Sequence, residues 1–179
     1  MGQIGLQTSR PSFETVWSMK LNISNIILVI TATLTALMAG LFYAWSCSVM
    51  LGFARLKDRE FVSVMQKCNR AIQNPVFFAA FFGAPIFLII STILHYAESS
   101  QFLLLLIATI IYLVGNFGVT IFGNVPLNNI LESFDAKNST DEEVNRLRTN
   151  FERPWNLLNH IRAVASTVSL ILVVIACLY

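Results

Sequence analysis

Four long stretches without a charged side chain constrain this sequence more than any other feature. The stretches cover residues 21–54, 71–97, 99–131 and 163–179. Each is close to or above the length that crosses a bilayer, because a helix rises about 1.5 Å per residue and the hydrocarbon core is about 30 Å thick. We therefore expect an all-α fold, a transmembrane four-helix bundle with spans at about 23–50, 75–96, 101–123 and 157–178.

The composition excludes two large classes of protein. Charged residues make up 12% of the 179 residues, about half the share in ordinary soluble domains, which argues against a soluble enzyme. A net charge of +2 at pH 7 provides no basic face for nucleic acid. The first apolar stretch is too long and begins too late for a cleaved secretory signal. We expect a single domain, 21–179, after a disordered or interfacial segment, 1–20.

The positions of lysine and arginine predict the orientation in the membrane. With four spans, both termini and the loop between spans two and three share one side, which carries two lysine or arginine residues against ten in the other two loops. The positive-inside rule places the loops with ten in the cytoplasm and both termini outside. We expect a multi-pass protein of a bacterial inner membrane.

Two cytoplasmic helices are predicted between the spans. Residues 55–74 carry apolar side chains at three- and four-residue spacing with basic residues between them, which is typical of an amphipathic helix on the inner membrane surface. The run STDEE at 139–143 combines a helix cap with an acidic first turn, so a second helix should run to about Arg153 and stop at Pro154. Pro126 should bend the third span as it enters the cytoplasm.

Small residues are expected to let the spans approach closely. They are Ala39, Gly40, Gly115 and Gly118.

Polar side chains from all four spans gather at the predicted cytoplasmic level. On the last helix, two adjoining i, i+4 rows carry them. The rows are Glu152, Asn156 and His160, and Trp155, Asn159 and Arg162. The remaining candidates are Trp45, Asn74, Asn124 and Asn128. Polar groups at membrane depth are costly and tend to face the bundle interior. Two interpretations stay open: a polar pocket that binds a ligand at the inner leaflet, or a set of interhelical hydrogen bonds and interfacial anchors.

The histidines and cysteines argue against a metal or haem site. His95 and His160 are expected at opposite ends of the bundle, so one haem cannot take both as ligands, and His95 should be interfacial. Cys47, Cys68 and Cys177 form no C-x-x-C pair, and no ligand spacing surrounds either histidine. We expect no metal, no cofactor and no disulfide.

Four sequence blocks resemble a known family. They are AGLFYAWS at 39–46 followed by VM at 49–50, N-x4-N-P at 69–75, GNVPLN at 123–128, and FE-x2-WN-x2-N-x2-R at 151–162. Together they resemble the anthrone oxygenase-like family of small four-span membrane proteins, many of them uncharacterised bacterial proteins. The similarity covers most of the chain from about Leu28 onward.

The resemblance implies an oxygenase that needs no cofactor. Fungal members of the family oxidise an anthrone, a tricyclic aromatic, to the anthraquinone with molecular oxygen. Such a reaction calls for a base and for donors to the developing enolate oxygen. The resemblance implies His160 as the base with Glu152 second, Asn124, Asn128 and Arg162 as donors, and Trp45 and Trp155 as aromatic walls.

A second hypothesis is a membrane module without enzymatic activity. The same helices could hold a lipid, a quinone or a haem, or scaffold a partner protein through the inner loops, because family membership transfers fold better than activity. Both hypotheses expect membrane lipids and a lipophilic small molecule as partners, exclude nucleic acid, and are compatible with a homo-oligomer.

Overall fold

A computed structural model describes residues 22–179, and the N-terminal segment predicted at 1–20 lies outside this range. The described residues form helices and no strand, and four of the helices are long and apolar enough to cross a membrane. The elements, in which η denotes a π-helical turn, are α2 Ile23–Ala44, η1 Trp45–Val49, α3 Met50–Phe53, α4 Asp58–Ile72, α5 Pro75–Leu94, α6 Ser99–Tyr112, η2 Leu113–Gly118, η3 Thr120–Asn124, α7 Val125–Glu132 and α8 Asp141–Ala176.

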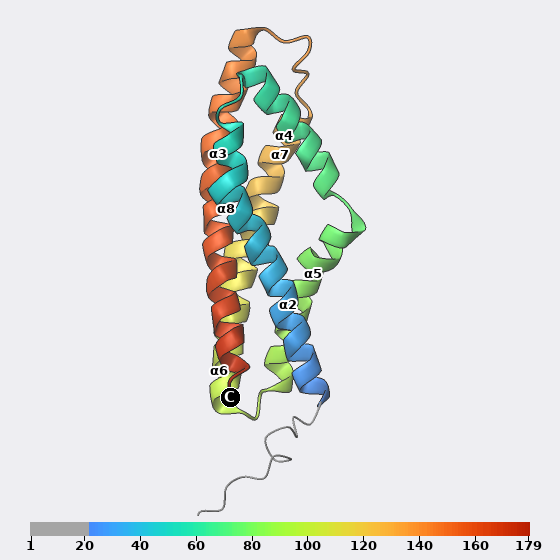
Figure 1. The fold of residues 1–179 in the computed structure, drawn as a ribbon, viewed down its shortest axis with the longest axis vertical. Coiled ribbons are helices and arrows are strands. Elements are labelled where there is room, and N and C mark those ends of the chain that lie inside the picture. Colours follow the sequence, from blue (N-terminus) through green and yellow to red (C-terminus); the bar gives the residue numbers. More distant parts are fainter. Residues whose placement is uncertain (1–21) are drawn as a thin grey trace, which may run out of the picture.

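The four long helices form one elongated bundle (Figure 1). The start of α2, the α5–α6 turn and the C-terminus lie at one end, and the α3–α4 turn and the loop between α7 and α8 lie at the other. Short connections join α5 to α6 and α7 to α8, as in up-and-down bundles, whereas α4 lies in the connection between the first and second spans. The bundle confirms the predicted all-α membrane-spanning architecture.

The second span begins where the sequence predicts. Asn74 caps α5, because its side-chain oxygen accepts a hydrogen bond from the Phe77 N–H at 3.0 Å. Pro75 then occupies the first turn, where backbone N–H groups have no helical partner and the missing donor is not needed.

The helix that contains the third span is longer than the expected 101–123. It runs from Ser99 to Glu132 and passes through Pro126. This proline lies in the first turn after the π-helical turn η3, where the wider turn has already interrupted the regular hydrogen-bond ladder. The missing N–H therefore does not end the helix.

The predicted helix stop at Pro154 is wrong. α8 begins after its Thr140 cap as predicted, but it continues to Ala176 with Pro154 inside it. A proline within a helix removes one backbone hydrogen bond. Phe151 and Trp155, on either side of it, bury large aromatic rings against other helices and are only 2% and 4% exposed. This packing holds the helix continuous across the proline.

The amphipathic helix exists as α4, and its apolar side packs on protein. Phe61, Val62 and Met65 are fully buried against residues of α7 and α8. Figure 1 shows α4 turning back from the end of α3 toward α5. An apolar stripe with basic flanks fits a membrane surface and a protein partner equally well, so the sequence pattern alone could not choose between them.

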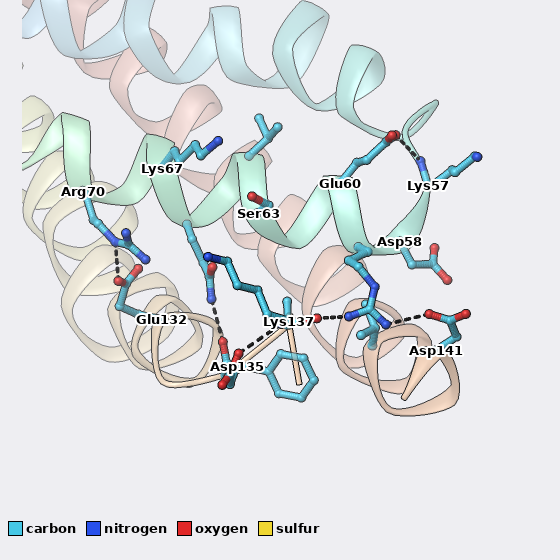
Figure 2. A pocket seen from close by; sticks show the side chains of 16 residues that line it. Lys57, Asp58, Glu60, Ser63, Lys67, Arg70, Glu132, Asp135, Lys137 and Asp141 are labelled. Carbon is cyan, nitrogen blue, oxygen red and sulfur yellow. Dashed lines mark hydrogen bonds and ion pairs between the residues drawn. The ribbon is translucent and has the colours of Figure 1, made fainter. Parts of the chain in front are cut away.

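Ion pairs and hydrogen bonds tie α4 to the loop before α8. Arg59 bonds the Ala136 carbonyl and pairs with Asp141 at 2.7 Å, and Arg70 pairs with Glu132 at 2.5 Å. Figure 2 shows that the surface groove between these segments, about 1100 Å³ in volume, carries side chains of both signs. Because oppositely charged side chains pair across the groove, they hold its two sides together, and its surface does not present charge of a single sign.

Glycines of the third span allow close packing against α8. A Cβ at Gly115 would lie 2.6 Å from Ala165 Cβ, and one at Gly123 would lie 2.9 Å from Leu158 Cδ1. Gly40, expected to serve the first span in the same way, has open space around it. The third and fourth spans therefore form the tight glycine-mediated contact.

Candidate functional site

A cavity of about 360 Å³ lies beside the corner where α4 meets α5. Segments α2, η1, α4, α5, η3, α7 and α8 all line it. The volume lies within the range of small-molecule sites, about 300–1,000 Å³. Its polar lining residues are Cys68, Asn69, Gln73, Thr120, Asn128, Asn129, Asn159 and Arg162.

One face of α8 supplies the centre of the site. Trp155, Asn159 and Arg162 stand four and three residues apart, so they share a helix face, and all three line the cavity. Asn159 is held by its own amide, which donates to the Ser46 hydroxyl at 2.8 Å and to the Phe42 carbonyl at 3.1 Å. These bonds fasten α8 to the first span next to the π-helical turn η1, where the regular backbone ladder is interrupted.

The Arg162 guanidinium is buried without a carboxylate. Its central carbon lies 4.2 Å from the Phe42 ring centroid and 5.5 Å from that of Trp155. Nη2 donates to Asn159 Oδ1 at 2.7 Å, and Nη1 donates to Thr120 Oγ1 at 3.4 Å. Within residues 22–179 no ion pair includes Arg162, although it is only 6% exposed. A buried cation normally has a charged partner, and here side chains supply none.

Two buried donors in the cavity wall lack a hydrogen-bond partner in the part of the chain described. They are Arg162 Nε and Asn69 Nδ2, and Asn69 is 7% exposed. Leaving a buried polar group unbonded costs about 1–3 kcal/mol, and more for a charged group. Since both groups are N–H donors, the cavity is complementary to a ligand that presents acceptor oxygens.

Flat aromatic rings form the remaining walls. On α5, the ring centroids of Phe77 and Phe81 lie 5.4 Å apart in a stacked arrangement, and Phe117 of η2, which does not line the cavity, stacks on Phe81 at 5.2 Å. Trp45 and Trp155 also line the cavity, and their ring centroids lie 5.5 Å apart. The Trp155 indole N–H donates to Asn128 Oδ1 at 2.8 Å. Ring-lined walls favour a planar aromatic ligand, because offset and edge-to-face ring contacts add to the burial of apolar area.

The rim of the cavity is apolar and turned outward. Its outer lining residues Phe78, Phe82, Ile121 and Val125 are 39–46% exposed. All four belong to helices long and apolar enough to span a membrane. An outward-facing apolar rim of this kind is suited to contact with lipid.

The structure brings together half of the residues that the sequence singles out for this site. The ones that line the cavity are Trp45, Asn128, Trp155, Asn159 and Arg162. Asn74 caps α5 instead. Asn124 is 1% exposed and donates to the Trp155 carbonyl at 3.4 Å, so it supports α8 from outside the cavity wall.

The second α8 row lies on another face of the helix and does not line the cavity. His160 is exposed, and its Nδ1 bonds the Asn156 carbonyl at 2.6 Å. Glu152 pairs with Arg148 at 2.7 Å. The structure therefore does not bring the expected bases, His160 and Glu152, to the Arg162 side.

The other chemical groups of interest are few. Cys68 lines the cavity, and burial raises the pKa of its thiol. His95, expected at the interface, is 2% exposed and bonds the Ser91 carbonyl through Nδ1 at 2.8 Å. Among the described residues, no three side chains of His, Cys, Asp or Glu gather as a possible metal site.

Sequence reasoning missed Asn69 and the α5 phenylalanines as site residues. The signals were present: Asn69 opens the N-x4-N-P block, and the pairs at 77–78 and 81–82 repeat at helical spacing. They were not decisive, because an apolar span may direct aromatic rings to lipid or to the interior equally well.

Comparison with known proteins identifies a family. The family model for anthrone oxygenase matches residues 73–172, which include Asn128, Trp155, Asn159 and Arg162. Comparison with curated proteins and with solved structures gives no match. The first span and all of α4 lie outside the matched range, so the resemblance seen at 39–46 stays a prediction. Because the family model covers more than half of the chain, the chain belongs to the anthrone oxygenase family.

Proposed function

We propose that this protein is a membrane-embedded oxygenase that acts, without a cofactor, on a flat lipophilic aromatic of the anthrone type. The observation that carries the proposal is the ring-walled cavity with an unpaired guanidinium at Arg162. The family membership supplies the class of reaction.

The proposed reaction needs only the substrate and oxygen. The anthrone methylene loses a proton, and the resulting enolate carbanion forms a C–O bond with O₂. After protonation, the hydroperoxide loses water as its O–O bond and the remaining C–H bond break, which leaves the second quinone carbonyl. One O₂ is consumed and one water is released for each anthraquinone formed.

The lining side chains supply hydrogen-bond donors and ring faces for this reaction, and no carboxylate or imidazole is present among the described lining residues. Arg162 Nε and Asn69 Nδ2 are free to donate to the enolate oxygen, and such donors stabilise charge that develops in the transition state. Trp45, Phe77 and Phe81 would cover the ring faces. Substrate and O₂, both soluble in lipid, would enter across the apolar rim.

Oxygen uptake by the purified protein in lipid nanodiscs tests the proposal. Anthrone is added with a chelator and without flavin or metal, while an oxygen electrode follows O₂ and absorbance follows anthraquinone. We expect equal amounts of O₂ consumed and quinone formed, at a rate well above that of empty nanodiscs. Arg162→Gln should lose most of this rate, and Arg153→Gln, which changes an exposed arginine of the same helix, should keep it. A rate equal to that of empty nanodiscs would reject the oxygenase.

A quinone-binding protein without catalysis is the second candidate. The two unpartnered donors favour it, because a quinone carbonyl accepts hydrogen bonds as an enolate oxygen does. Saturable binding of anthraquinone without faster anthrone oxidation would identify this function.

A further inference from the structure

The charge at Arg162 is unbalanced on every side. α2, η1, α5 and α8 present aromatic rings or amides, and η3 and α7 present Thr120, Asn128 and Asn129. Cys68 of α4 is the other titratable group in the described lining, and burial raises the pKa of its thiol, which keeps the thiol neutral.

Two ionisable groups of α8 outside the lining, Glu152 and His160, do not pair with Arg162 either. Glu152 is engaged by Arg148, and His160 is exposed on another face of α8. The cavity therefore holds a cation, two free donors, and neither a carboxylate nor an imidazole among its described lining residues.

We propose that the cavity binds its ligand as an anion, the ionised form of a phenol or enol, and that Arg162 drives this ionisation in place of a side-chain base. The inference rests on the proposed function of the same cavity and specifies the charge state of its ligand. An opposite charge within a few ångströms favours ionisation, and a weakly polar surrounding strengthens the effect.

The proton balance of this step is simple. The acidic O–H or C–H bond of the ligand breaks, its electron pair stays on the ligand, and the proton passes to water. Gln73 and Asn129 are exposed polar residues of the lining, and they mark the side on which water can accept the proton. The ligand oxygen then accepts hydrogen bonds from Arg162 Nε and Asn69 Nδ2.

A coloured probe tests the ionisation without any turnover. 2-Hydroxyanthraquinone is planar, has one ionisable phenol and changes colour when that phenol ionises. It is titrated with pH in nanodiscs of zwitterionic lipid, with and without the protein. We expect the bound probe to ionise at least about one pH unit lower than the probe in empty nanodiscs, which equals a tenfold or larger preference for the anion. Arg162→Gln should abolish the shift, Arg162→Lys should retain part of it, and Arg153→Gln should retain all of it.

A second measurement uses the wild-type protein alone and so does not depend on how the variants fold. 2-Methoxyanthraquinone has the same rings but cannot ionise, and it should bind at least about tenfold more weakly than the hydroxy probe at a pH above the phenol's transition. Nanodiscs that contain phosphatidylglycerol test whether an anionic lipid headgroup competes with the aromatic anion for the cavity. The pH shift of the probe should persist in them.

Four results would overturn the inference. A probe that binds with an unshifted transition, or a methoxy compound that binds equally well, rejects ionisation by Arg162 but leaves the proposed oxygenase standing. Displacement of the probe by phosphatidylglycerol would show that Arg162 binds a lipid headgroup instead of an aromatic anion. A failure of both probes to bind would reject the inference and the aromatic ligand class together.

Discussion

Arg162 is the residue on which the site depends. A guanidinium inside a membrane domain costs several kcal/mol unless it is paired or solvated. Stacking on Phe42 and a bond to Asn159 offset part of this cost, but Nε has no partner among the described residues. Apolar side chains would pack there at lower cost, so a buried arginine at this position agrees with the binding role that we propose for it.

Substitutions at Asn69 and Asn159 test ligand binding and protein stability separately. Asn69→Leu removes a donor that has no described partner, so we expect an unchanged or higher melting temperature and roughly tenfold weaker quinone binding, typical of a lost bond to a ligand oxygen. Asn159→Leu breaks bonds to Ser46, Phe42 and Arg162 and should lower the melting temperature clearly. Thermal unfolding and quinone titration in the same nanodiscs measure both. A clear loss of stability in Asn69→Leu would show that its amide holds the fold.

The sequence predicted the α8 residues of the site better than their partners. Spacing alone identified two polar rows on the last helix, and the row with Trp155, Asn159 and Arg162 lines the cavity. Nothing local distinguishes that row from the one with His160, because the direction of a helix face is decided by tertiary packing. The partners Asn69 and Phe81 come from other helices, and the spacing of residues along one helix does not show which residues of another helix they will face.

At the scale of elements, continuous helices and π-helical turns shape the site. The cavity is bordered by η1 and η3, which contribute Trp45 and Thr120. Local rules located the helix starts at Asn74–Pro75 and at Thr140, because capping is a local interaction. The same rules misplaced the stop at Pro154, since buried rings on either side outweigh one lost backbone bond.

Glycine substitutions test the contact between the third and fourth spans. Gly115→Leu would force a side chain against Ala165, whose Cβ lies 2.6 Å from the position of an added Cβ, and should destabilise the protein by about 1–3 kcal/mol through overpacking. Gly40→Leu is the matched control, because open space surrounds that position. Thermal unfolding in detergent compares them. Equal melting temperatures would contradict the packing described for η2 and α8.

The contact between α4 and α8 should weaken in acid. The Asn145 side chain donates to Asp58 at 2.8 Å and Arg148 pairs with it at 2.8 Å, so the pKa of Asp58 lies below its ordinary value, chiefly because of the Asn145 hydrogen bond and despite partial burial. A lowered pKa in the folded state gives stability that is complete above the unfolded pKa, about 4, and is lost as pH falls through the folded pKa. The melting temperature should therefore fall less between pH 5 and pH 3 in Asp58→Asn than in wild type. An identical pH dependence would contradict this assignment.

At the scale of the whole molecule, the bundle places its charged loops at one end. The α3–α4 turn and the loop before α8 lie together, opposite the α5–α6 turn and the C-terminus. The count of basic residues predicts that the charged end is cytoplasmic. In a variant without its three native cysteines, Lys137→Cys should resist a membrane-impermeant maleimide in intact cells and react after permeabilisation, whereas Tyr179→Cys should react at once. The reverse pattern would invert the predicted orientation.

Tryptophan fluorescence tests most directly whether the cavity beside Arg162 binds a planar aromatic. The chain has three tryptophans, of which Trp45 and Trp155 line the cavity. In nanodiscs, the Trp17→Phe variant should be quenched by anthraquinone to a plateau at one molecule per chain. The double variant Trp45→Phe, Trp155→Phe keeps Trp17 alone and should show only weak quenching that rises linearly with the quinone in the lipid. Equal, non-saturating quenching of both variants would contradict the proposal that this cavity is a binding site.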